Sequence, residues 1–226
     1  MSVVRPADSA DLRDTADLHL AQLPGGFFAR LGAGFLRRYH ATFLVSPYAV
    51  AFVATGVDEA VGFLVGTLDN RPHYRFVVKR LGLRLALRAG AAMLIRPALL
   101  WLFLRTRAVR YARWILRYPL RARQVPAAAG SAPPAGVAGP TVAVLTHVAV
   151  SASAQGNGTG RALVAAFVDA ARAAGADEAR LVTTAGGPAE RFYDRLGWIA
   201  GEIRPAAAGE GMVREYRLPL REIAAP

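Results

Sequence analysis

The spacing of apolar residues near the N-terminus predicts one short strand followed by two helices. Residues 2–5 form a β-branched run typical of a strand, and Asp8 follows as the predicted N-cap of a helix that reaches Leu20. The Pro-Gly-Gly sequence at 24–26 ends that helix. Apolar side chains at three- and four-residue spacings then predict one continuous helix from Phe27 to about residue 43.

The next apolar runs have the pattern of strands. Residues 49–55 and 60–68 are separated by a short polar turn, which predicts an antiparallel hairpin. Residues 141–150 are almost unbroken apolar sequence, typical of a strand buried on both faces. Beyond them the pattern predicts a helix at 159–174, a strand at 179–184, a helix at 188–195 and strands at 197–203 and 211–218. The predicted fold class is therefore α/β, with a mixed sheet.

The segment 70–123 differs from the rest of the chain in charge. Residues 71–123 contain fourteen basic residues and no acidic one, while the remainder carries fourteen basic and sixteen acidic residues, so the net charge of +12 belongs to this segment. Arginines beside apolar residues at three- and four-residue spacings predict basic amphipathic helices. We interpret 70–123 as a helical insertion, and the Ala-, Pro- and Gly-rich residues 124–140 as a flexible loop.

Composition and the N-terminus exclude several classes of function. The chain has no cysteine, which excludes a disulfide framework, a thiolate metal site and a cysteine nucleophile. Acidic residues near the N-terminus stand where a signal peptide needs basic and apolar residues, so we expect a cytoplasmic protein. The most apolar stretch, 93–104, is interrupted by Arg96 and Pro97 and is shorter than the roughly 20 residues that span a bilayer.

A glycine-rich segment, S-A-S-A-Q-G-N-G-T-G-R at 151–161, connects the strand at 141–150 to the helix predicted from 159. A strand, a glycine-rich turn and a helix N-terminus can form an anion-binding cradle, because backbone N–H groups face the ligand and glycine lets a phosphate approach closely. A turn without a ligand is the structural alternative. The segment lacks G-x-G-x-x-G, and no G-K-[ST] follows, so a dinucleotide fold and a nucleotide hydrolase are disfavoured.

Two motifs resemble the GNAT superfamily of N-acetyltransferases. Gln155, Gly158 and Gly160 occupy the positions of its pyrophosphate motif [RQ]-x-x-G-x-[GA], and residues 189–198, A-E-R-F-Y-D-R-L-G-W, are similar to its A-x-x-F-Y-x-x-x-G-[FW] segment. The resemblance implies a single domain over 1–226, with a mixed, mostly antiparallel sheet and the insertion between strands 3 and 4. Residues 141–216 would be the acyl-CoA-binding and catalytic half.

The resemblance also implies roles for individual residues. Main-chain atoms of the strand at Val148, Ala149 and Val150 would bind the pantetheine arm of acetyl-CoA or of a longer acyl-CoA. Tyr193 would be the general acid that protonates the departing thiolate, and packing beside Phe192 is the structural alternative. The pyrophosphate would be held by Gln155, Gly156, Asn157, Gly158, Thr159, Gly160 and Arg161.

The sequence offers several candidates for the general base. The acceptor amine must lose a proton, and His147 is a candidate because imidazole titrates near neutrality. The family's base usually aligns with Val144 or Thr146, and strict alternation along a strand turns His147 to the opposite face unless a bulge intervenes. A purely structural histidine is the alternative. Further candidates are Glu59, Asp69 and His73 as bases, and Phe27, Phe28, Asp69 and His73 as acceptor-binding residues.

The predicted function is transfer of an acyl group, acetyl by default, from acyl-CoA to a primary amine of a small molecule or peptide. The amine attacks directly in a ternary complex, without a metal. The alternative is a long-chain acyltransferase that uses acyl-CoA or an acyl carrier protein, with a lipid-linked or peptide natural-product acceptor. Residues 75–123 would then contact the carrier protein or an anionic membrane, and the protein would be peripheral at the inner membrane face.

An alternative of another class is a basic nucleic-acid- or membrane-binding protein on a GNAT-like scaffold without turnover. The arginines of 70–123 are interleaved with Leu, Trp and Phe, and no nucleic-acid module is evident, so we expect no nucleic-acid partner. The sequence leaves open whether the protein forms a homodimer.

Overall fold

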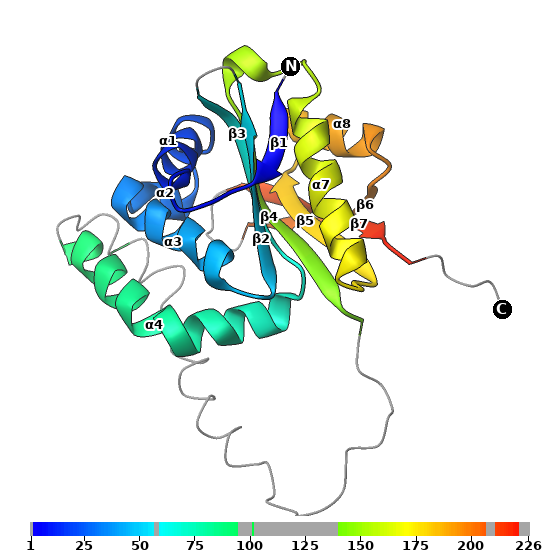
Figure 1. Ribbon diagram of the computed structural model, residues 1–226. Coiled ribbons are helices and arrows are strands. Elements are labelled where there is room, and N and C mark those ends of the chain that lie inside the picture. Colours follow the sequence, from blue (N-terminus) through cyan, green and yellow to red (C-terminus); the bar gives the residue numbers. More distant parts are fainter. Residues whose placement is uncertain (1, 57–58, 95–100, 102–139, 207–210, 222–226) are drawn as a thin grey trace, which may run out of the picture.

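A seven-stranded mixed sheet forms the centre of the molecule in the computed structural model, which describes residues 2–56, 59–94, 101, 140–206 and 211–221 (Figure 1). The strand order is β1-β2-β3-β4-β5-β7-β6, and all neighbouring pairs are antiparallel except β4 and β5. The strands are β1 (Val3–Pro6), β2 (Ala49–Thr55), β3 (Ala60–Thr67), β4 (Val142–Val150), β5 (Glu178–Thr184), β6 (Ile199–Pro205) and β7 (Met212–Pro219). The predicted mixed, mostly antiparallel sheet is confirmed.

Helices cover both faces of this sheet (Figure 1). They are α1 (Leu12–Gln22), α2 (Phe27–Arg30), α3 (Ala33–Val45), α4 (Asn70–Leu94), α7 (Thr159–Ala173) and α8 (Pro188–Arg195), with a short 3-10 helix η2 (Ala152–Ala154). On one face α1 and α3 pack on β2 and β3, around the fully buried Phe63. On the other face α7 packs on β2, β3 and β4 through Leu163 and Phe167, which are also fully buried.

The start of α1 differs from the prediction. Asp8 is not the N-cap: its carboxylate accepts a hydrogen bond from the Ala10 amide at 2.7 Å, and α1 begins only at Leu12 with Asp11 in the N-cap position. Asp11 is held by a bidentate pair with Arg5 of β1, at 2.8 and 2.7 Å, and by the Asp8 amide. The acidic turn therefore connects the first strand to the first helix rather than starting the helix itself.

The single helix predicted from Phe27 to residue 43 is two helices. Gly32 separates α2 from α3 with a φ of 88°, a left-handed conformation that glycine adopts without steric cost. The apolar stripe continues across the break, because Phe28 of α2 stacks on Phe35 and contacts the tilted ring of Tyr39 in α3. The apolar spacing was informative about the buried face, but it could not show the change in helix direction.

The insertion begins as a helix. Residues 70–94 form α4, which agrees with the helical pattern predicted there, and α4 lies between β3 and β4 in the chain. Residues 95–100 and 102–139, on which the rest of the insertion and the loop at 124–140 were predicted, lie outside the described residues. Among the helices that are described, none has the length and apolar character needed to cross a membrane.

Candidate active site

A cleft opens where β4 and β5 separate. Their parallel pairing extends only from Val142–Glu178 to Val144–Arg180, although β4 continues to Val150 and β5 to Thr184. The cleft has a volume of about 1310 Å³ and is lined by β4, β5, the α1–α2 loop, the glycine-rich loop and α8. The edge of β4 that faces β5 beyond Val144 has no strand partner among the described residues, so its backbone groups are available to an extended ligand.

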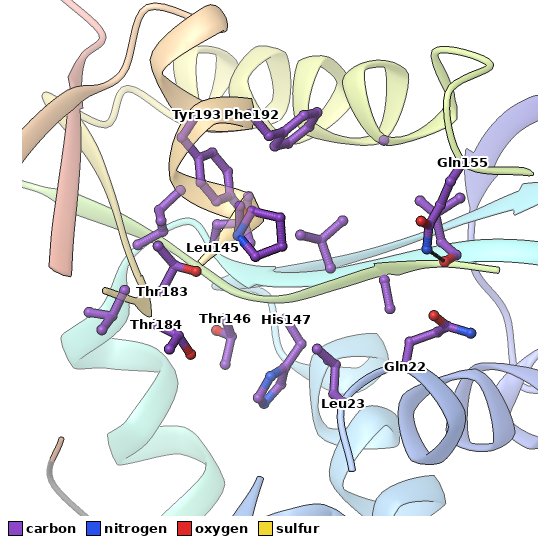
Figure 2. A pocket seen from close by; sticks show the side chains of 18 of the residues that line it. Gln22, Leu23, Leu145, Thr146, His147, Gln155, Thr183, Thr184, Phe192 and Tyr193 are labelled. Atoms are coloured by element: carbon purple, nitrogen blue, oxygen red, sulfur yellow. Dashed lines mark hydrogen bonds between the residues drawn. The ribbon is translucent and has the colours of Figure 1, made fainter. Parts of the chain in front are cut away.

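A bulge in β4 lies at the point where the two strands separate. Val65 of β3 pairs with His147, but the next residue, Gly66, pairs with Leu145, so Thr146 is the extra residue. Strict alternation would turn His147 to the face opposite to Thr146 unless a bulge intervened, and the inserted residue is such a bulge. Figure 2 shows both side chains on the same side of β4, with Leu145 on the other.

The glycine-rich loop has the geometry expected of an anion cradle. Gly156 and Gly158 have φ values of 80° and 81°, and Gly158 is the N-cap of α7. The Gln155 side chain donates to the Val150 carbonyl at 3.1 Å and ties the loop to the end of β4. The first turn of α7 contains no acidic residue, and Arg161 lies there beside the cleft. These features fit the pyrophosphate of coenzyme A.

The predicted pyrophosphate loop contributes to the cleft with most of its residues. Among them Gln155, Gly156, Gly158, Gly160 and Arg161 line the cleft, as do Val148, Ala149 and Val150 of β4. Asn157 and Thr159 do not line it; they lie beside a smaller hollow next to the N-terminus. Thr159 is buried there, and its hydroxyl is 2.9 Å from that of Ser2.

Tyr193 reaches the cleft from α8, whose first turn begins with Pro188. Its ring packs against Phe192, Trp198 and Tyr216, and only 5% of the residue is exposed. Burial raises the pKa of the Tyr193 phenol above its ordinary value, so the group keeps its proton at physiological pH. A buried, protonated phenol beside the gap can donate a proton but is poorly suited to accept one.

Two contacts with β7 fix α8. The Tyr216 hydroxyl donates to Asp194 at 3.0 Å, and the Arg214 guanidinium lies 2.9 Å from the Glu190 carboxylate. They hold the helix that carries Tyr193 against the sheet.

The opposite face of the gap is formed by different elements. Figure 2 shows Tyr193 and Phe192 on the side of α7 and α8, and Thr146, His147 and Leu23 on the other side of β4. His147 contacts the rings of His19 and Tyr39, and its Nε2 is 3.4 Å from the Tyr39 hydroxyl. Burial, followed by the proximity of His19 and His40, lowers the pKa of His147 to about 3, so its imidazole is neutral at physiological pH.

Four residues predicted to bind the acceptor, and one further candidate base, do not line the cleft in the described part of the chain. His73 is buried near the start of α4, where its Nδ1 is 3.0 Å from the Ser46 hydroxyl and its ring stacks on Phe43. Asp69 accepts a hydrogen bond from the Arg71 amide at 3.3 Å. The others are Glu59 in the β2–β3 turn and Phe27 and Phe28 in α2.

The acceptor side includes residues that the sequence did not single out. His19, Gln22 and Leu23 line the cleft from the end of α1 and the loop that follows it. His19 stands on an amphipathic helix among core residues, so its sequence context does not mark it as a site residue. The one signal in the sequence that could have indicated a position in the cleft was the Pro-Gly-Gly break, which places a loop beside it. Its position next to the end of β4 depends on long-range packing.

Comparisons with known proteins agree with this geometry. A family model described as Acetyltransferase (GNAT) family matches residues 97–198, a range that contains both motifs identified in the sequence. No curated protein matches the chain.

Solved structures share the fold. A protein of the GNAT acetyltransferase family from Desulfovibrio desulfuricans is 17% identical, with a TM-score of 0.56 over 98% of this chain and 100% of that one. A structure described as histone acetyltransferase HPA2 and related acetyltransferase, from Corynebacterium glutamicum, is 18% identical, with a TM-score of 0.56 over 99% of both chains. The protein yncA from Salmonella typhimurium, solved with its cofactor acetyl-CoA, is 16% identical, with a TM-score of 0.55 over 100% of this chain and 98% of that one.

At these identities the likeness to the solved structures establishes the fold alone. Acyl-CoA-dependent acyl transfer is the reaction of this family, and acetyl-CoA is its typical co-substrate. The splayed central strands, the glycine-rich loop and the family model that matches residues 97–198 together make the chain similar to GNAT acetyltransferases in fold and in motifs.

Proposed function

We propose that the protein transfers an acetyl group from acetyl-CoA to a primary amine by direct attack in a ternary complex. The observation that carries the proposal is the gap between β4 and β5, which places Tyr193 on one face of the sheet and His147 on the other. A thioester held in this gap is accessible to an acid from one side and to an amine from the other.

Coenzyme A would bind along the diverging edge of β4. Backbone groups of residues 148–150 would pair with the amides of the pantetheine arm, and residues 155–161 would hold the pyrophosphate at the N-terminus of α7. Arg161 adds a positive charge at this end of the cleft. The cofactor therefore enters from the side of α7 and α8.

Proton transfers accompany the attack. The amine nitrogen adds to the thioester carbonyl carbon, and the tetrahedral intermediate then collapses by breaking the carbon–sulfur bond. Tyr193 donates its phenolic proton to the departing sulfur of coenzyme A. His147 accepts the proton from the attacking nitrogen, which is far more acidic in the intermediate than in the free amine. This proton later returns to solvent through the cleft, and Tyr193 regains a proton from solvent by the same route.

The charge of the cleft limits which classes of acceptor amine we expect the protein to use. Arg161 and Arg195 are the charged residues that line it within the described part of the chain, and that lining contains no carboxylate. A polycationic acceptor would meet no compensating charge. The proposal therefore favours a small molecule or a peptide N-terminus in which the reacting amine is the main positive group.

A second candidate function is binding of an anionic partner by the insertion that begins with α4. The helix α4 contains Arg75, Lys79 and Arg80 and no acidic residue, and it exposes Tyr74 by 54% and Val78 by 37%. This combination favours contact with an anionic surface, either a membrane leaflet or an acyl carrier protein that delivers a longer acyl chain. Sedimentation with phosphatidylglycerol vesicles at low and high salt tests the membrane; binding of a purified acyl carrier protein tests the other.

The proposed reaction can be measured without background, because the chain has no cysteine and a thiol reagent reports only released coenzyme A. Acetyl-CoA is mixed with a panel of primary amines that differ in charge, and mass spectrometry identifies the acetylated product. Amine-dependent thiol release is expected, with neutral-bodied amines preferred over polyamines. Calorimetry that finds no binding of acetyl-CoA or coenzyme A would reject the proposal.

A further inference from the structure

His19 contacts two of the other three histidines of this chain, His40 and His147, between the sheet and the helices α1 and α3. The ring of His19 lies edge-on to His147, with 4.6 Å between their centroids, and 5.3 Å from that of His40. Phe63 of β3 packs against His19 and His40, at centroid distances of 5.8 and 5.0 Å. His147 belongs to the proposed active site, whereas His19 and His40 have no role in the reaction as described so far.

A hydrogen-bonded chain runs inward from His19. Its Nδ1 is 3.1 Å from Nε2 of His40, and Nδ1 of His40 is 3.1 Å from the Thr15 hydroxyl. Both histidines and Thr15 are buried, at 1% and 4% exposure. Of these three residues His19 alone lines the cleft, and its Nε2 has no hydrogen-bond partner among the described residues.

This series of hydrogen bonds from His19 to Thr15 resembles the arrangement by which an enzyme orients a catalytic base. A histidine that acts as a base needs one nitrogen free toward the substrate and the other fixed by a partner. The Thr15 hydroxyl can accept from Nδ1–H of His40, whose Nε2 then accepts from Nδ1–H of His19. In this arrangement the lone pair of His19 is on Nε2, the atom without a partner. Burial lowers the pKa of His19 to about 4 and that of His40 to about 3, so both imidazoles are neutral at physiological pH.

We propose that His19 is a second proton acceptor on the acceptor side of the gap, and that His40 and Thr15 are positioning residues that fix its tautomer. This inference rests on the proposed acetyl transfer. In this second route the proton leaves the attacking amine nitrogen for Nε2 of His19 instead of His147, and it returns to solvent through the cleft after the product departs. While His19 is cationic, its Nδ1–H makes a charge-assisted hydrogen bond to the neutral His40. No proton has to cross the buried interior.

The tautomers can be tested on the wild-type protein. With only four histidines, two-dimensional ¹H–¹⁵N correlation of the imidazole side chains resolves each ring. Free histidine prefers the tautomer with the proton on Nε2, so protonation at Nδ1 of both His19 and His40 is diagnostic. A proton on Nε2 of His19 at neutral pH would overturn the proposal.

Kinetics of two matched His40 variants test its positioning role. His40→Gln keeps an amide oxygen that can accept from His19, whereas His40→Leu removes the acceptor. We expect His40→Leu to lower kcat about tenfold or more at an unchanged KM for acetyl-CoA, and His40→Gln to restore most of the loss. His73→Gln is the control, because His73 is equally buried and bonded to a hydroxyl but lies outside the cleft. Equal kcat for the Leu and Gln variants would contradict the positioning role.

Chemical rescue tests proton acceptance directly. We expect His19→Ala to lose about 100-fold in kcat, and added imidazoles to restore activity in proportion to their basicity. A purely structural role predicts rescue that depends on imidazole size and not on basicity, and that outcome would overturn the proposal. If wild-type protein releases no coenzyme A with any amine, the proposed function itself fails; activity in the wild type with an unaffected His19 variant removes only this inference.

Discussion

The phenol of Tyr193 is a donor because of its surroundings. Three aromatic rings surround it, and burial in this apolar environment disfavours the anionic form. In the reaction that we propose, this phenol donates its proton to sulfur only as the carbon–sulfur bond breaks, and solvent restores the proton afterwards.

Replacing Tyr193 by Phe removes this proton while keeping the ring. We expect kcat to fall about 100-fold, since general acid catalysis contributes at least that much, with the Kd for coenzyme A changed less than about twofold. Stopped-flow thiol release and calorimetry measure the two quantities. Tyr48→Phe, at an exposed position outside the cleft, is the matched control. Unchanged turnover in Tyr193→Phe would remove the acid role.

The pH dependence of the reaction follows from the neutral histidines. Burial holds the pKa of His147 at about 3 and that of His19 at about 4, so neither becomes protonated between pH 5 and 9. We expect kcat/KM to rise with pH because the acceptor amine loses its proton, and the apparent pKa of the profile to follow that of the amine. Profiles with two amines of different basicity measure this. A common apparent pKa near 6.5 for both would indicate an ordinary, solvated histidine.

At the scale of elements, the approach of α7 to the sheet depends on small residues of β3. A Cβ added at Gly66 would lie 2.6 Å from the Phe167 ring and 3.0 Å from the Val144 carbonyl. Neither can move freely, because Phe167 is fully buried and Val144 belongs to the central strand. Glycine at this position sets the distance between helix and sheet.

The substitution Gly66→Ala should therefore destabilise the protein by about 1–3 kcal/mol through overpacking, measured as the free energy of unfolding in urea. Gly90→Ala is the contrasting change, because no atom of the described residues lies within 4 Å of the added Cβ and the residue is in α4. That variant should gain about 0.5–1 kcal/mol from helix propensity. Equal effects of the two substitutions would refute the packing argument.

Most elements could be predicted because their signals are local. The hairpin, the strand at 141–150 and the helix after the glycine-rich loop appear as expected, since apolar period and turn residues decide them. The break at Gly32 and the bulge at Thr146 could not be predicted, because each depends on what the segment packs against. The same holds for the site: the phosphate loop and Tyr193 belong to motifs, whereas the contacts of His19 join residues 21 and more positions apart.

For the molecule as a whole, the buried histidines connect stability to pH. All four have pKa values lowered by burial, to about 4 for His19 and His73 and about 3 for His40 and His147, from 6.5. In the unfolded chain each binds a proton near pH 6.5, so below that pH the unfolded state holds more protons than the folded state. The stability is complete above pH 6.5 and is lost progressively as the pH falls toward 4.

We therefore expect the free energy of unfolding to decrease with falling pH below 6.5, by up to about 1.4 kcal/mol per pH unit for each histidine. Urea denaturation at half-unit steps from pH 7.5 to 5 measures the slope. His73→Gln should give a shallower slope than the wild type, since one buried titrating group is removed. A stability that stays constant down to pH 5 would show that these histidines are protonated in the folded state.

The parallel ladder between β4 and β5 consists of three residue pairs, Val142–Glu178, Ala143–Ala179 and Val144–Arg180. In the described part of the sheet, the strands β5, β7 and β6 are hydrogen-bonded to the other four strands through these three pairs alone, and side-chain packing supplies the remaining contacts between the two halves. Amide protons of residues 145–150 and 181–184 that face the gap should consequently exchange with deuterium quickly in the free protein. Binding of coenzyme A should slow them selectively, because the pantetheine arm then takes the place of the missing strand neighbour and joins the two halves into one continuous sheet.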